Sequence, residues 1–183
     1  MYKITNKEIE GCVELIPTIF HDHRGKFVKT MVNDEFIKIN LNTNFEEEFY
    51  TLSKQGVLRG LHFQNPPYEH DKLVYCPYGE IYDVVFDLRS NSPSYGKFSV
   101  NVINSELGNM LYIPKGVAHG FCTLSKEALV IYKVNSKYSP QHDMGILWSS
   151  INLNWPIKNP IISERDKNFI SFDKFVSEFY YYL

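Results

Sequence analysis

Apolar and polar residues alternate in short runs along most of the chain, and Gly, Pro, Asn or Ser separates one run from the next. A period of two puts successive side chains on opposite faces of a β-strand, whereas an amphipathic helix needs a period near 3.6. Many short strands with turn residues between them are typical of an all-β sandwich or barrel. The predicted strands cover residues 26–31, 57–63, 72–76, 81–88, 98–103, 109–113 and 129–134.

Helical periodicity is confined to two short segments. Residues 34–40 predict one or two helical turns, and apolar residues three or four positions apart predict a second helix over 172–183. No linker, low-complexity tract or internal repeat interrupts the sequence. We therefore expect a single domain over residues 1–183, with short peripheral helices and a short helical tail over 167–183.

The composition is that of an ordinary globular protein: 183 residues, 44% hydrophobic, 22% charged, with a formal net charge of −2. This near-neutral balance predicts neither a nucleic acid nor a membrane surface as partner. No run approaches the roughly 20 apolar residues of a membrane span, and the first residues lack the apolar core of a signal peptide. Cys12, Cys76 and Cys122 fit neither a disulfide framework nor a zinc pattern, so we expect a reduced, cytoplasmic protein.

One strand carries two reactive side chains whose spacing is informative. Strict alternation would place Arg59 and His62 on opposite faces, because their positions differ by an odd number. Gly60 lies between them, and a glycine inside a strand often marks a β-bulge. A bulge would turn both side chains to one face; the alternative is that the glycine merely makes room for a bulky neighbour.

The spacing of several residues approximates the two cupin motifs, which a double-stranded β-helix brings together on one cavity. The first group is Gly56, His62, Gln64, Glu69 and Gly79, and the second is Gly108, Pro114, Gly116 and His119.

Metal-binding cupins use two His separated by one residue, a Glu, and a His from the second motif. Here Gln64 replaces the second His, which leaves His62, Glu69 and His119. Gln is a poor ligand for borderline divalent metals, and Glu69 lies in a loop. We therefore expect no metal and no cofactor; a metal-dependent cupin dioxygenase or isomerase stays open as a weaker alternative.

A metal-free pocket with these side chains can ionise a carbon acid beside a ketone. The enolate oxygen must be stabilised while a base removes the proton, and Lys72 and His62 suit these two tasks. The ordinary pKa of His, about 6.5, suits a base at neutral pH. Tyr132 can donate a proton to the opposite face of the carbon, although the residues by themselves favour plain aromatic packing for a lone Tyr in a chain with 13 Tyr.

At this point the sequence resembles the nucleotide-sugar 3,5-epimerases of the dTDP-4-dehydrorhamnose type, which are non-metal cupins. The resemblance implies a cupin jelly roll and a deoxysugar-nucleotide isomerase. The matching blocks keep the family's order and are residues 22–27, 57–64, 72–74, 79–89, 92–97, 113–121, 132–133, 138–140, 155–156 and 163–166.

The resemblance also implies roles for individual residues. His62 would be the base that removes the sugar proton, Asp166 the carboxylate that orients it, Tyr132 the acid on the far face, and Lys72 the cation at the C4 oxygen. The implied substrate-binding residues are Arg24, Phe27, Lys29, Glu47, Phe49, Arg59, Gln64, His119, Tyr138, Asp143 and Arg165. Arginine suits a diphosphate in an otherwise neutral protein.

Three positions on the family's nucleotide side depart from its usual pattern. Glu47 and Phe49 replace Gln and Asn, and Lys29 stands where Glu is common. A carboxylate only accepts hydrogen bonds, so Glu47 favours a base that presents an amino group. This suggests CDP first and GDP next, rather than dTDP. The alternatives are that Glu47 pairs with Lys29 or that its strand is locally reorganised.

The resulting prediction is a cupin enzyme that epimerises C3, C5 or both in a nucleotide-linked 4-keto-6-deoxyhexose, through an enolate, for bacterial surface polysaccharides. The resemblance implies a homodimer in which N-terminal strands cross to the partner. A ketoisomerase on a similar substrate and a non-catalytic sugar-nucleotide-binding cupin remain alternatives.

Overall fold

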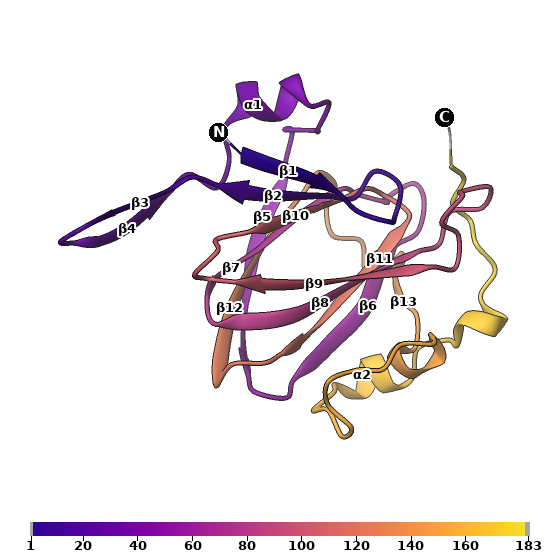
Figure 1. Ribbon diagram of the computed structural model, residues 1–183. Coiled ribbons are helices and arrows are strands. Elements are labelled where there is room, and N and C mark those ends of the chain that lie inside the picture. The colour runs from indigo at the N-terminus through magenta and orange to yellow at the C-terminus, as the bar shows by residue number, and fades with distance from the viewer. Residues whose placement is uncertain (1, 182–183) are drawn as a thin grey trace.

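Two antiparallel β-sheets form the body of the protein in a computed structural model that describes residues 2–181 (Figure 1). The six-stranded sheet has the order β1 (Tyr2–Asn6), β2 (Val13–Pro17), β10 (Met110–Ile113), β7 (Lys72–Tyr78), β12 (Glu127–Val134) and β5 (Glu47–Lys54). The five-stranded sheet has the order β13 (Asp143–Gly145), β6 (Leu58–Gln64), β11 (Val117–Thr123), β8 (Glu80–Asp87) and β9 (Phe98–Asn104). Apolar side chains from both sheets share one core between them.

From β5 onward the chain passes back and forth between the two sheets. Strands β5, β7, β10 and β12 belong to one sheet, and β6, β8, β9, β11 and β13 to the other. This alternation is the double-stranded β-helix of a cupin, so the predicted fold class is confirmed. It also brings β12 to the same interior as β6 and β7, although β12 follows them much later in the sequence.

Burial along the strands follows the predicted alternation. In β12 the even positions from Ala128 to Val134 are buried, and the odd positions are half-buried. In β11 all seven residues are buried, because this strand lies inside the five-stranded sheet and the C-terminal segment covers the sheet's outer face.

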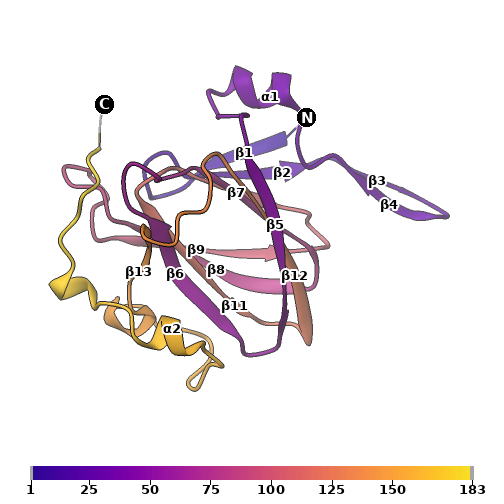
Figure 2. The ribbon, with the colours of Figure 1, turned by 180° about the vertical axis from the view of Figure 1, so that it is seen from behind.

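Helix α1 (Asn33–Lys38) confirms the helical turns predicted near residues 34–40 and covers part of the six-stranded sheet (Figures 1 and 2). Its Phe36 is fully buried and packs with Leu15, Leu73 and Met110. The edge-on contact between Phe36 and Tyr2, with ring centroids 5.6 Å apart, extends this cluster to β1.

The helical tail expected over 167–183 is wrong for most of its length. Only α2 (Glu164–Lys167) reaches into it and a single 3-10 turn, η2 (Phe172–Lys174), lies within it; residues 182–183 fall outside the described part. Phe175 and Phe179 each pack edge-on against Phe63, with ring centroids 5.5 Å apart. A separation of four places side chains on one side of an extended chain as well as of a helix, so the spacing could not distinguish the two.

The extended form is held by backbone hydrogen bonds to Ser90, whose N–H donates to the Phe179 carbonyl and whose carbonyl accepts from Tyr181. Another 3-10 turn, η1 (Trp148–Ser150), precedes this region. Among residues 2–181 no helix is long and apolar enough to cross a membrane.

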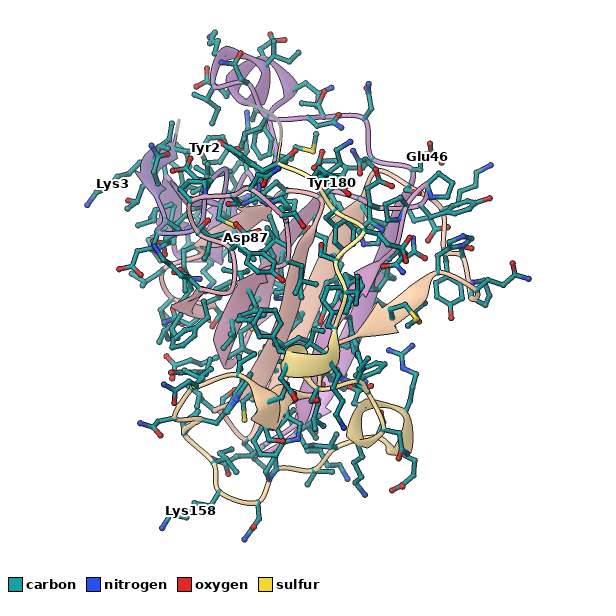
Figure 3. All side chains as sticks on the ribbon, turned by 90° about the vertical axis from the view of Figure 1, so that its right-hand side faces the viewer. Tyr2, Lys3, Glu46, Asp87, Lys158 and Tyr180 are labelled. Atoms are coloured by element: carbon teal, nitrogen blue, oxygen red, sulfur yellow. The ribbon has the colours of Figure 1, made fainter. Side chains whose placement is uncertain are left out.

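The turn after β8 is built around a fully buried carboxylate. Asp87 lies in the interior, whereas Lys3 and Lys158 point outward from the surface (Figure 3). Asp87 accepts hydrogen bonds from Arg89 and from the hydroxyls of Ser92 and Ser94. Burial of such a charge is tolerated because these donors compensate it, so this part of the family-like block 79–89 is structural.

Strands β3 (Ile19–Asp22) and β4 (Gly25–Val28) form a separate hairpin that projects away from both sheets (Figures 1 and 2). Phe20 and Phe27 are more than half exposed on it. This is an unusual position for two aromatic rings, since their burial is normally favourable.

Candidate active site

A cavity of about 420 Å³ opens between the two sheets and is lined by β5, β6, β7, β11 and β12. This is the size of a pocket for a small molecule. The predicted site residues that line it are Glu47, Phe49, Arg59, His62, Gln64, Lys72, His119, Tyr132, Tyr138, Asp143 and Arg165.

Four predicted site residues are not in that lining. Asp166 lies behind His62 and contacts it directly. Arg24, Phe27 and Lys29 belong to the projecting hairpin or follow it, so the structure does not bring them to this chain's own cavity. Arg24 is exposed and pairs with Asp22 at the hairpin turn.

A bulge in β6 turns Arg59 and His62 to the same side, as one of the two predicted possibilities required. His62 is opposite His119 in β11, but Arg59 is opposite Phe121, so one extra residue is accommodated between the two pairs. Gly60 has a φ of +123° and a Cβ there would lie 2.5 Å from the Cα of Gly120. Only glycine fits this close crossing of β6 and β11.

His62 and Asp166 form a hydrogen-bonded pair 2.9 Å apart, between Nε2 and Oδ2. Burial raises the pKa of Asp166, but the hydrogen bonds from His62 and from the Gly60 amide outweigh it and hold the pKa well below its usual range. The carboxylate therefore accepts, the shared hydrogen is on Nε2, and Nδ1 is the basic nitrogen of His62.

Helix α2 places Asp166 against β6. The Ser163 hydroxyl caps the helix by accepting from the Asp166 amide at 3.1 Å, and Arg165 adds a contact to the same carboxylate at 3.4 Å. A second hollow, lined in part by Ile161 and Ile162, also borders the His62–Asp166 pair. The His62 side chain is 30% exposed, so its ring has access to solvent.

Lys72, at the start of β7, is buried in the cavity wall. Burial lowers its pKa to about 8, and the negative charges of Asp71 and Asp143 act against this change. At neutral pH the amine is still an ammonium, and its charge is poorly hydrated. Such a cation interacts strongly with an oxygen that becomes negative beside it.

Tyr132 enters the cavity from β12, in the opposite sheet to His62. Its ring is buried, stacks on the Phe49 ring with centroids 4.8 Å apart, and meets the His119 ring edge-on at 6.0 Å. Burial raises the pKa of the phenol, while the Thr51 hydroxyl acts in the opposite direction. The phenol of Tyr132 is therefore protonated at neutral pH.

His119 has its own carboxylate partner. Its Nε2 lies 2.6 Å from Oδ2 of Asp83 on β8, and both side chains are buried. Asp83 was not among the site residues predicted from the sequence. A carboxylate inside the otherwise apolar strand of residues 81–88 was the available signal, because a buried charge needs a partner.

Two arginines and Tyr138 also line the cavity. Arg59 donates from Nε to the Ser53 hydroxyl at 3.0 Å, and Arg165 forms an ion pair with Asp143. Tyr138 is exposed, and its hydroxyl donates to the same Asp143 at 3.3 Å. The arginines suit a diphosphate, and the Tyr138 ring suits a flat ring.

Glu47 is occupied by the protein itself. Its Oε1 accepts from the backbone N–H of Tyr138 at 2.9 Å. The alternative of a Glu47–Lys29 pair is not what the structure shows, and one carboxylate oxygen is already used. Glu47 is therefore only partly available to accept a hydrogen bond from the amino group of a cytosine or guanine.

Gln64 braces loops instead of binding a metal. Its Nε2 donates to the carbonyls of Tyr68 and Lys137, and its Oε1 accepts from the Ser139 amide. Glu69, another candidate ligand, is near Lys115 at 3.7 Å. Residues 2–181 contain no group of three His, Cys, Asp or Glu placed to hold a metal. The absence of a metal requirement stays a prediction.

The family model of dTDP-4-dehydrorhamnose 3,5-epimerase matches residues 6–174. The chain belongs to this family. It is thus a sugar-nucleotide epimerase, that is, an isomerase, and the family resemblance read from the sequence is confirmed.

Relatives support this over nearly the whole chain. A dTDP-4-dehydrorhamnose 3,5-epimerase of Shigella flexneri is 40% identical over 179 residues, which cover 94% of this chain and 99% of the relative. The 3,5-epimerase of Legionella pneumophila, solved with dTDP-4-keto-L-rhamnose, has a TM-score of 0.95 at 28% identity with full coverage of both chains. That of Bacillus anthracis, solved with TDP and PPi, has a TM-score of 0.89 at 34% identity, with 92% of this chain and 98% of that chain covered.

His70 and Thr51 also line the cavity, and neither was among the site residues predicted from the sequence. Burial lowers the pKa of His70 to about 2, so it is neutral, and its Nδ1 lies 3.2 Å from Nε2 of Gln64. Thr51 faces the cavity next to Tyr132. His70 lies in an irregular loop, where no periodicity indicates which side chains point inward.

Proposed function

We propose that this 3,5-epimerase acts on a dTDP-linked 4-keto-6-deoxyhexose through an enolate. The observation that carries the proposal is one cavity in which His62 on one sheet faces Tyr132 on the other, with Lys72 in the wall. The names of the relatives give the nucleotide as dTDP and the sugar as a 4-dehydro-6-deoxyhexose.

In the first step His62 breaks a C–H bond next to the C4 ketone. Nδ1 takes the proton, and the electron pair of that bond moves into the carbon–carbon bond and onto the C4 oxygen. Asp166 holds the Nε2 hydrogen, so it fixes the tautomer and stabilises the imidazolium that forms.

Lys72 stabilises the enolate oxygen. The ammonium is already buried before substrate arrives, so little reorganisation is needed when negative charge develops.

In the second step Tyr132 donates its phenolic proton to the opposite face of the carbon, which inverts the centre. The tyrosinate regains a proton, and His62 loses its own to solvent. The same sequence at C3 and at C5 gives the double epimerisation. The deoxysugar formed would serve bacterial surface-polysaccharide synthesis.

Thymidine diphosphate would lie in the same cavity, which Arg59, Arg165 and Tyr138 line. The two arginines would bind the diphosphate, and the exposed Tyr138 ring would stack on the base. Calorimetry with dTDP, CDP and GDP tests the nucleotide: tighter binding of dTDP is expected, and equal or tighter binding of CDP or GDP would contradict it.

The protein would act as a homodimer in which each projecting hairpin reaches the partner's cavity. Exposed Phe20 and Phe27, and the distance of Arg24 from its own chain's cavity, support this arrangement. A symmetric exchange of the same element is a common way to build a dimer.

Turnover in heavy water tests the proposed reaction. The protein is incubated with dTDP-4-dehydro-6-deoxyglucose, and NMR follows deuterium and configuration at C3 and C5. Inversion with deuterium at both centres is expected, and His62→Asn should remove it. Migration of the ketone would instead indicate a ketoisomerase, and no turnover of any 4-keto sugar nucleotide would overturn the proposal.

A further inference from the structure

Phe49 stacks on the ring of Tyr132, the proposed acid. The resemblance placed position 49 on the nucleotide side, where the family usually has Asn. In this chain the Phe49 and Tyr132 rings are 4.8 Å apart and tilted by only 14°, which is face-to-face stacking. This contact is a departure of the chain from its family at the chemical centre.

The geometry of β5 explains why Phe49 reaches Tyr132. Phe49 is directly opposite Tyr132 in the antiparallel pairing of β5 and β12, so both rings rise from the same place on the inner face of the sheet. Tyr50, the next residue, points to the outer face and is 70% exposed.

The Tyr132 ring is thus fixed from two directions. Phe49 covers one face, and the His119 ring approaches edge-on at 6.0 Å, itself held by Asp83. Aromatic pairs of this kind have a preferred geometry and add to the effect of burial. Phe49 also removes water from the face of the ring that it covers.

We propose that Phe49 is a positioning residue for Tyr132 and decides whether the enolate is inverted or returned to substrate. The proposal rests on the proposed epimerase reaction. Phe49 touches neither reacting atom in it; it acts by holding the phenol against the far face of the sugar.

Two fates of the enolate give the proposal a measurable signature. If Tyr132 is in place, its proton forms the new C–H bond on the far face and the centre is inverted. If Tyr132 is displaced, protonated His62 returns a proton to the original face and the configuration is retained. In heavy water His62 exchanges its proton with solvent, so the returned substrate carries deuterium without inversion.

The experiment compares Phe49→Leu with wild type in heavy water, by NMR at C3 and C5. The ratio of deuterium in uninverted substrate to inverted product is expected to rise about three- to tenfold, as loss of an aromatic pair would produce. KM should change little. Phe49→Tyr keeps the stacked ring and should keep the wild-type ratio.

Tyr50→Leu is the matched control, since it makes the same truncation on the outer face of the same strand. Phe49 is 46% exposed, so its truncation spares the core; Phe49→Asn replaces it if the leucine variant does not fold. A raised KM with an unchanged ratio would assign Phe49 to substrate binding and overturn the inference. Failure of wild type to exchange deuterium would instead overturn the proposed function.

Discussion

The amine of Lys72 is buried in the cavity wall, where water has little access to it. Its pKa of about 8 lies below that of an ordinary lysine because burial disfavours the charged form. Burial lowers the proton affinity of the amine, and it also strengthens the electrostatic attraction between the ammonium and an enolate oxygen. Catalysis and titration are therefore linked in one side chain.

The rate should fall as pH rises through about 8, since the ammonium is present below this pH and lost above it. The measurement is kcat against pH. Lys72→Met should lower kcat throughout and abolish this alkaline limb. An identical alkaline limb in wild type and variant would show that another group titrates there.

Asp166→Asn should lower kcat by about 10²- to 10⁴-fold, the usual contribution of a general base, because the amide no longer fixes the Nε2–H tautomer of His62. KM should stay near the wild-type value. Deuterium incorporation at C3 and C5 should fall in parallel. Undiminished incorporation would show that Asp166 does not assist proton removal by His62.

At the scale of elements, the crossing of β6 and β11 sets the direction of the base. Gly60 meets Gly120 so closely that neither strand has room for a side chain there. The bulge at this point aims Arg59 and His62 into the same cavity.

Gly60→Ala should destabilise the fold and reduce kcat, because it combines an unfavourable positive φ with a backbone clash. Gly25→Ala is the control: Gly25 has a similar φ of +125°, but nothing lies within 4 Å of its Cβ position. It should cost only the conformational part, about 1–2 kcal/mol in the free energy of unfolding. Equal losses in denaturant titrations would contradict the clash.

Gln64→Glu should raise KM more than it lowers kcat. The variant loses the amide donor to the carbonyls of Tyr68 and Lys137, which loosens the loop that carries Tyr138. Each unsatisfied buried group costs about 1–3 kcal/mol. Gln55→Glu, with one exposed bond to Leu124, is the control. Steady-state kinetics check this, and an unchanged KM would contradict the bracing role.

The sequence predicted features that depend on neighbouring residues, such as strands and turns. Alternation identified β6, β7, β8, β9, β10 and β12 but did not give β1, β2, β3, β5 or β13. The glycine between Arg59 and His62 left the bulge as one of two possibilities. The tail failed because the spacing of Phe175 and Phe179 fits extended chain and helix equally. Contacts between distant segments had no sequence signal.

Two such contacts decided the site. Asp166 is 104 positions from His62, so only the family resemblance indicated the pair. The partner of Glu47, a backbone amide 91 positions away, was not predictable at all. This contact occupies one of the two carboxylate oxygens on which the CDP or GDP hypothesis rested, and the relatives are named for dTDP instead.

At the scale of the whole molecule, the hairpin is the element that its own cavity does not use. The β3–β4 hairpin, which carries Arg24 and Phe27, projects away from both sheets (Figure 1), and neither residue lines the cavity of its own chain. A second copy is required if these residues are to meet the substrate.

Mixing two impaired variants tests the exchange. Arg24→Ala and His62→Asn should each lose activity as homodimers. When they are co-refolded, one site of each mixed dimer combines an intact His62 with the partner's intact Arg24, so activity should return. No recovery despite mixed dimers shown by mass spectrometry would mean that the hairpin serves its own chain.

The proton acceptor and the proton donor stand on different sheets, His62 on the five-stranded and Tyr132 on the six-stranded one. The distance between these two residues therefore depends on the size of the core side chains that separate the two sheets. Val85 and Val130, which belong to this core and do not line the cavity, help to set that distance. Evolution can tune the length of the proton's path by resizing them, without touching a single reactive group.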